Sequence, residues 1–143
     1  MLTDEYVLQK FGEGIDCSMM VLAEFADDLG ITKDEAYRTA SCFGSGMLLG
    51  SVCGAVTGAF IVIGMKHGNY GLNDLAQKGI VLSKRDEFVK RFGEEHGSVN
   101  CPELLGADLR DMEQRQYAHD NHIIDTECPK FCRTAVRILN DIL

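Results

Sequence analysis

Residues 50–60 read GSVCGAVTGAF and open the least polar part of the chain. Glycine is a poor helix former, yet the apolar residues that follow continue in a run that favours a helix. We expect a helix from about Ser51 to His67 that lies buried at the centre of the protein. Gly54 and Gly58 fall on one face of this helix, where a second backbone can approach closely.

The same segment carries no charge between Arg38 and Lys66, a length that could cross a bilayer. Only GAVTGAFIVIGM, residues 54–65, is continuously apolar, and this stretch is shorter than the about 20 residues that a membrane span requires. We therefore expect a buried central helix rather than a membrane helix.

Apolar residues recur with helical spacing over most of the chain, and no stretch alternates strictly enough to predict a strand. Thr32 and Glu35 have capping-box spacing, directly after Gly30, which is placed as the C-terminal glycine of the preceding helix. Further helices are expected after Ser83 as N-cap and over residues 129–143. The prediction is an all-α, single-domain helical bundle of about five to six helices around the central Gly/Cys-containing apolar helix.

Length and composition limit the class of protein. With 143 residues, of which 45% are hydrophobic and 25% charged, residues 1–143 are expected to form one domain that needs no disulfide or metal to fold. The formal charge of -8 repels nucleic acid, which excludes it as a partner. The N-terminal MLTDEYVLQKF lacks the basic and apolar regions of a secretory signal, so we expect a cytoplasmic protein with reduced cysteines.

The chain has 6 cysteines but no C-x-x-C pair, which disfavours zinc ribbons, thioredoxin-type dithiols and covalently attached haem. Four of them stand where helices are expected to begin, at the positive end of the helix dipole, which favours a thiolate: Cys17, Cys53, Cys101 and Cys128. Four helix ends together offer roughly two positive charges, comparable to the charge of about −2 on an oxidised two-iron cluster with four thiolates.

Free cysteine is also a common core residue, so packing is the alternative interpretation of each thiol. We interpret Cys42 and Cys132 in this way, although Cys132 lies one turn after Cys128 and the two could chelate a metal. Together with the nearby thiol of Cys53, the small residues Gly54 and Gly58 are interpreted as the wall of a cofactor site.

The chain resembles a family of redox-active proteins named after the pattern C…GCAxxG…C…C. Residues 53–58, CGAVTG, represent the central motif, and the other three thiols of the pattern match Cys17, Cys101 and Cys128. Relatives of this domain within split-Soret cytochromes are associated with a [2Fe-2S] cluster, so the resemblance implies electron transfer but no established reaction. Cys42 and Cys132 depart from the family pattern and leave the set of ligands open to exchange.

Three hypotheses follow. The first is a small redox protein that binds a [2Fe-2S] cluster through its four cysteines and exchanges electrons with another redox protein. The second is a metal-free thiol protein in which Cys53 attacks and Cys101 or Cys128 resolves a disulfide, or in which a thiol carries sulfur. The third is a structural zinc site. The small-residue face and the many methionines also suggest self-association as a homodimer.

Other functional motifs are scarce. His119 and His122, in YAHDNHIID, have the spacing of a helical metal pair, but we interpret them as part of a polar surface loop. No phosphate-binding loop, G-x-S-x-G motif or dinucleotide fingerprint occurs, so neither a hydrolase nor a nucleotide-dependent enzyme is predicted, and no catalytic residue is assigned.

Overall fold

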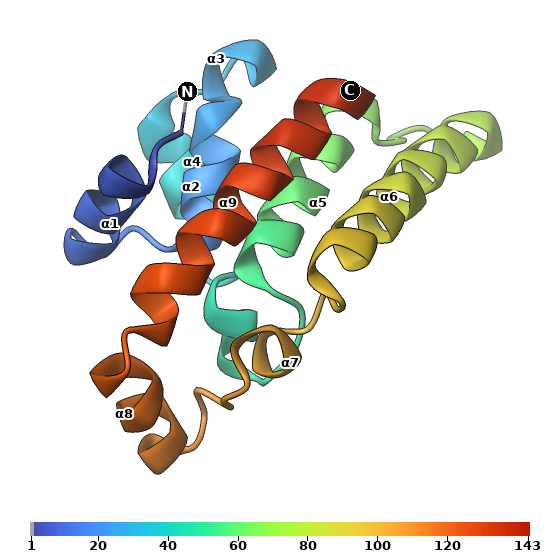
Figure 1. Cartoon of the computed structure of the whole chain (residues 1–143). Helices are drawn as coiled ribbons and strands as arrows, with labels where there is room; N and C mark the ends of the chain where they lie inside the picture. Colours follow the sequence, from blue (N-terminus) through green and yellow to red (C-terminus); the bar gives the residue numbers. More distant parts are fainter. Residues whose placement is uncertain (1) are drawn as a thin grey trace.

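Helix α5 (Gly54–His67) lies at the centre of the computed structural model, which describes residues 2–143. The helices of these residues are α1 (Asp4–Gly12), α2 (Cys17–Glu24), α3 (Ala26–Leu29), α4 (Lys33–Ala40), the 3-10 helix η1 (Ser45–Leu48), α5, α6 (Leu75–His96), α7 (Cys101–Leu105), α8 (Met112–Asp120) and α9 (Ile123–Ile142). Helices α2, α6 and α9 pack around α5 (Figure 1).

The expected all-α, single-domain fold is confirmed. The chain is divided into more and shorter helices than the five to six expected, because short helices such as α3 and α7 end at glycines with left-handed backbone angles. Gly30 has φ 71° and Gly106 has φ 64°. Across residues 2–143, strand pairing is limited to one isolated bridge between Val52 and Asn100.

Several local signals were correct. Thr32 caps α4 with a full capping box, in which the Glu35 N–H donates to Thr32 Oγ1 at 3.1 Å and the Thr32 N–H donates to Glu35 Oε2 at 2.8 Å. Helix α5 ends at His67, followed by Gly68. Within the part of the chain that the structure describes, no helix is both long enough and apolar enough to cross a membrane.

Two predicted helix starts are wrong. Helix α6 begins at Leu75, so Ser83 lies inside the helix instead of capping it. Helix α9 begins at Ile123, so Pro129 lies in its second turn rather than at its start. Proline removes one helical hydrogen bond, but the loss is tolerated here because burial of the apolar face of α9 stabilises the helix as a whole.

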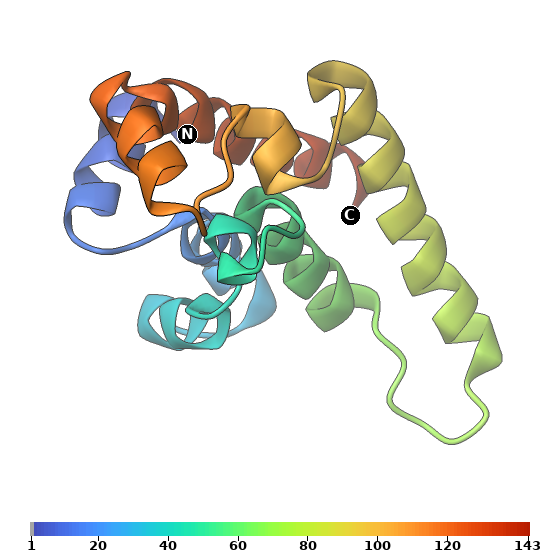
Figure 2. The same ribbon diagram turned by 90° about the horizontal axis from the view of Figure 1, so that it is seen from below.

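Helices α2 and α5 approach each other closely. A Cβ added to Gly58 would lie only 2.7 Å from the Ser18 carbonyl oxygen and 3.0 Å from Ser18 Cα, so glycine is required there. Helix α6, by contrast, is joined to α5 by an extended segment, residues 68–74, and diverges from the other helices (Figure 2). It is held through large side chains, because Phe88 and Phe92 are the buried residues of its 22.

Candidate functional site

A cavity of about 230 Å³ lies where the beginnings of α2, α5 and α7 face the first half of α9. The four cysteines singled out from the sequence all line it, and all four are buried: Cys17, Cys53, Cys101 and Cys128. The other lining side chains are mainly apolar, among them Phe11, Ile15, Leu104, Leu109, Ile124 and Phe131. The fold therefore brings four thiols from distant parts of the chain to one apolar cavity.

Three of the four thiols lie at helix N-termini. Cys17 is the first residue of α2, after the N-cap Asp16, whose carboxylate accepts a hydrogen bond from the Met19 N–H at 3.3 Å. Cys53 is the N-cap of α5, and Cys101 is the first residue of α7. The expectation that Cys128 also begins a helix is wrong, because α9 starts five residues earlier, at Ile123.

Cys53 and Cys101 are held side by side by backbone hydrogen bonds. The Cys53 N–H donates to the Val99 carbonyl and the Cys101 N–H donates to the Ser51 carbonyl, both at 2.8 Å. These bonds flank the isolated bridge between the two segments and align them in antiparallel fashion. Two helix starts that are far apart in the sequence are thereby fixed at one wall of the cavity.

The two glycines assigned to the cofactor wall have different surroundings. Gly54 lines the cavity, and a Cβ there would lie 2.9 Å from Cys17 Sγ and 2.9 Å from Gly44 Cα. Gly58, one turn later, packs on Ser18 and is not among the residues that line the cavity. Gly54 thus makes room for a thiol, whereas Gly58 sets the spacing of α2 and α5.

Ser45, which also lines the cavity, belongs to a left-handed turn that the sequence did not predict. All four residues of η1 have positive φ: Ser45 (53°), Gly46 (64°), Met47 (58°) and Leu48 (53°). For residues other than glycine this conformation costs about 1–2 kcal/mol each, and such strain clusters at functional sites. The turn places the Ser45 N–H in hydrogen-bonding contact with the Cys17 thiol. It also places Gly46 where a Cβ would lie 2.9 Å from Cys101 Cβ.

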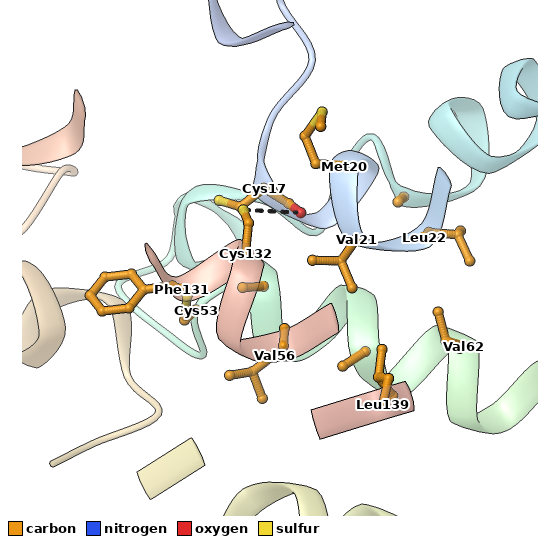
Figure 3. Close-up of a cluster of buried hydrophobic side chains, with 14 of the residues drawn as sticks. Cys17, Met20, Val21, Leu22, Cys53, Val56, Val62, Phe131, Cys132 and Leu139 are labelled. Carbon is orange, nitrogen blue, oxygen red and sulfur yellow. Dashed lines mark hydrogen bonds between the residues drawn. The ribbon is translucent and has the colours of Figure 1, made fainter. Parts of the chain in front are cut away.

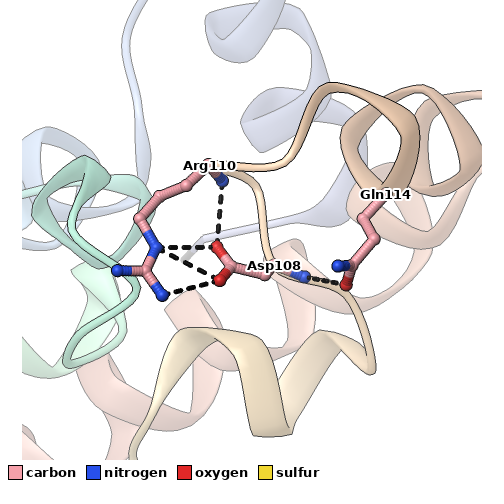
Figure 4. Close-up of polar contacts among 3 residues, drawn as sticks. All are labelled: Asp108, Arg110 and Gln114. Carbon is pink, nitrogen blue, oxygen red and sulfur yellow. Dashed lines mark hydrogen bonds and ion pairs between the residues drawn. The ribbon is translucent and has the colours of Figure 1, made fainter.

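An ion pair secures the segment between α7 and α8 beside the cavity (Figure 4). The Arg110 Nη2 and Nε donate to Asp108 Oδ2 and Oδ1 at 2.7 and 3.0 Å, and the Asp108 N–H donates to the Gln114 side chain at 2.8 Å. The Arg110 guanidinium packs so closely on Gly50 that a Cβ there would lie 2.7 Å away. Leu109, between the paired residues, lines the cavity, so the pair holds one of its walls.

The four cavity thiols differ in the direction in which their surroundings shift the pKa. Contact with the Cys132 thiol is the main cause that lowers the pKa of Cys17, and the Ser45 N–H acts in the same direction, although burial opposes both. Burial raises the pKa of Cys53 and of Cys128, and it raises the pKa of Cys101 to about 11. Without a bound cation, three of the four thiols are therefore neutral near neutral pH.

The remaining candidate residues lie away from the cavity lining. Cys42 is exposed, so its interpretation as a packing residue is wrong. Cys132 is fully buried in the core, as expected, and lies behind Cys17, with its Sγ 4.0 Å from the Cys17 carbonyl oxygen (Figure 3). His119 and His122 are exposed at the end of α8 and just before α9. Among residues 2–143, no group of three or more His, Cys, Asp or Glu side chains is arranged to hold a single metal ion.

Comparison with known proteins gives one finding. A family model described as "Putative redox-active protein (C_GCAxxG_C_C)" matches residues 15–142, which include every cysteine of the chain. Searches of curated proteins and of solved structures returned no match.

Proposed function

We propose, since this chain belongs to the C_GCAxxG_C_C family of redox-active proteins, that its cysteine-lined cavity holds an iron-sulfur cluster of the [2Fe-2S] type and exchanges single electrons with a partner redox protein in the cytoplasm. The observation that carries the proposal is the shared cavity of Cys17, Cys53, Cys101 and Cys128. Four thiolates are the usual ligands of such a cluster.

The donor set and the space fit this group. Cys17, Cys53, Cys101 and Cys128 would hold the cluster, and four thiolates are the donor set that a two-iron cluster requires. A cavity of about 230 Å³ with thiols around its wall meets that need. Glycine at positions 46 and 54 keeps space free beside Cys101 and Cys17, respectively, which a Cβ would fill.

The residues of the cavity have distinct roles in this proposal. The four cysteines would hold the cluster, which supplies the one-electron chemistry. Phe11, Ile15 and Phe131 are among the apolar side chains that keep water from it. Three of the four thiols carry protons before binding because burial raises their pKa, so uptake of the cluster releases protons and weakens as pH falls.

A metal-free thiol protein is the second candidate, and the lowered pKa of Cys17 favours it. The sequence hypothesis named Cys53 as the attacking thiol, but burial raises the pKa of Cys53, so Cys17 is the better nucleophile. Metal analysis distinguishes the candidates, because a thiol protein contains no iron and a structural zinc protein contains zinc without sulfide.

The test is anaerobic purification followed by analysis of iron, zinc and acid-labile sulfide. We expect a coloured protein with about two iron and two sulfide per chain. Serine in place of Cys17, Cys53, Cys101 or Cys128 should each remove most of the iron. The matched control Cys42→Ser, at an exposed thiol outside the cavity, should retain it. A colourless protein without iron would overturn the proposal.

A further inference from the structure

Cys132 is a buried core residue, as expected, and it lies directly behind Cys17. The two side chains are in hydrogen-bonding contact, and the Cys132 Sγ lies 4.0 Å from the Cys17 carbonyl oxygen. Figure 3 shows the two sulfur atoms side by side, from α2 and from α9. The contact therefore joins two helices through a pair of free thiols.

Access to the two thiols differs. Cys17 lines the cavity, so a small molecule that enters the cavity can reach its sulfur atom. Cys132 is 0% exposed and is not part of the cavity lining, so a molecule in the cavity meets Cys17 and not Cys132. Cys17 is placed to attack a molecule in the cavity and Cys132 to resolve the product, which is the arrangement that a two-step oxidation requires.

We infer that Cys17 and Cys132 form a reversible disulfide when a hydroperoxide enters the cavity. In the first step the Cys17 sulfur attacks one peroxide oxygen, the O–O bond breaks, and a sulfenic acid and water (or an alcohol) are formed. In the second step the Cys132 sulfur attacks the sulfenic sulfur, the S–S bond forms, and a second water molecule leaves. The two thiols are oxidised by two electrons, and the peroxide is reduced by two electrons.

The structure favours this pair over pairs that include Cys42 or Cys128. An S–S bond of about 2.05 Å would join two side chains that are already in contact. The cavity has a volume of about 230 Å³, several times the about 30 Å³ that one water molecule occupies in the liquid. A molecule as small as hydrogen peroxide therefore fits into it. Cys128 is four residues from Cys132 on the same rigid helix, and Cys42 is exposed outside the cavity.

Disulfide formation between Cys17 and Cys132 would affect the proposed cluster but does not require it. If Cys17 is a ligand, disulfide formation withdraws one of the four thiolates, so peroxide would release iron. If the protein binds no cluster, the same disulfide still forms. Iron content is therefore measured separately from the cross-link, and each proposal can fail alone.

The experiment uses the full chain, purified anaerobically under reductant and then freed of it. One portion is exposed to hydrogen peroxide and another is not, and the remaining thiols of both are alkylated. Peptide mapping by mass spectrometry should find the peptides of Cys17 and Cys132 joined, with a loss of about 2 Da, and a dithiol reductant should reverse the change. A cross-link mainly between other cysteines would overturn the inference. So would the absence of any cross-link when the Cys17 thiol is still reduced after exposure to peroxide.

Two variants show whether Cys132 resolves the intermediate. In Cys132→Ser, and in Cys132→Ala as a second variant if the first folds poorly, Cys17 should remain a sulfenic acid that a 1,3-dione probe traps. Trapping should rise at least about tenfold over the wild type, because the resolving thiol is absent. The control Cys42→Ser should form the disulfide as the wild type does. Equal trapping in the wild type and in both Cys132 variants would contradict the assigned role.

Discussion

Two helix interfaces of this protein are built in opposite ways. Between α2 and α5 the contact is made by small residues, and a Cβ on Gly58 would lie 2.7 Å from the Ser18 carbonyl oxygen. Between α6 and α9 it is made by aromatic rings. Phe92 and His96 of α6 meet Phe131 of α9, with ring centroids 6.1 and 4.9 Å apart, and Phe88 stacks on Phe92 within α6 at 5.8 Å.

The two interfaces have different roles: one positions the cavity residues, and the other stabilises the packing of α6. Small residues let two backbones approach, and this close approach sets Cys17 beside the start of α5, where Cys53 lies. Large rings bury much apolar surface and attach the outlying helix α6 to the rest of the protein. We therefore expect substitutions at the aromatic interface to change mainly stability, and those at the glycine interface to change the cavity as well.

The largest effect is expected at the aromatic interface. Phe92→Ala removes a fully buried ring, which should lower the free energy of unfolding by about 3–5 kcal/mol in chemical denaturation. Because Phe92 does not line the cavity, the iron content of the folded fraction should stay at the wild-type level. Loss of iron from the folded fraction would show that the two interfaces do not act separately.

A smaller loss of stability, with a change of the cavity, is expected at the glycine interface. Gly58→Ala places a methyl group against the backbone of Ser18, which cannot move without displacing α2. Overpacking of this kind should lower the free energy of unfolding by about 1–3 kcal/mol. Iron content should fall, since Cys17 moves with α2. A variant with wild-type stability and iron would contradict the close packing that we describe.

The matched control on α6 should change stability in the opposite direction. No atom lies within 4 Å of a Cβ added to Gly79, so Gly79→Ala replaces a poor helix former with a good one and causes no clash. Stability should rise by up to about 1 kcal/mol, with iron content unchanged. Destabilisation by Gly79→Ala in the same denaturation series would mean that this face of α6 is covered.

The smallest effect concerns pH. Burial lowers the pKa of His96, whose ring lies 4.8 Å from that of Phe92 and 4.9 Å from that of Phe131. The unfolded chain therefore binds this proton more readily, and stability present above the unfolded pKa of 6.5 is lost as pH falls toward the lower folded value.

His96→Gln keeps a polar group near Thr134 but cannot be protonated, so it should flatten this part of the pH profile. Denaturation between about pH 7 and pH 5 should show a shallower decline than in the wild type. In the wild type, His96 Nε2 lies 2.9 Å from Thr134 Oγ1. Loss of this hydrogen bond would lower stability equally at every pH, and is thereby distinguished from the loss of a titrating group, which changes the slope. Identical slopes in the two proteins would contradict the lowered pKa.

Local signals in the sequence predicted the elements whose ends depend on near neighbours. The capping box of Thr32 and Glu35 was correct because both partners lie within one helical turn. The end of α5 at His67 was correct for a similar reason. Ser83 failed as an N-cap because α6 already begins at Leu75, and a capping residue inside a continuous helix does not start a new one.

Signals that depend on distant parts of the chain were missed or misread. The proline after Cys128 indicated a helix start, but the packing of α9 extends the helix back to Ile123. The left-handed turn that begins at Ser45 lies in a glycine-rich stretch and was not predicted. Its backbone angles depend on its surroundings at the cavity and not on its local sequence. Cys132 is a core residue as expected, but its contact with Cys17 could not be predicted, since only the folded chain brings the two together.

The sequence by itself determined the all-α class, the position of the central helix and which four cysteines belong together, because helical periodicity, caps and the family pattern are written in short stretches. Only the tertiary structure decided that these thiols share one cavity, that Gly54 makes room for Cys17 while Gly58 spaces two helices, and that Cys132 contacts Cys17. Such contacts join residues far apart in the chain, and they form only when burial of the apolar helix faces brings α2, α5 and α9 together.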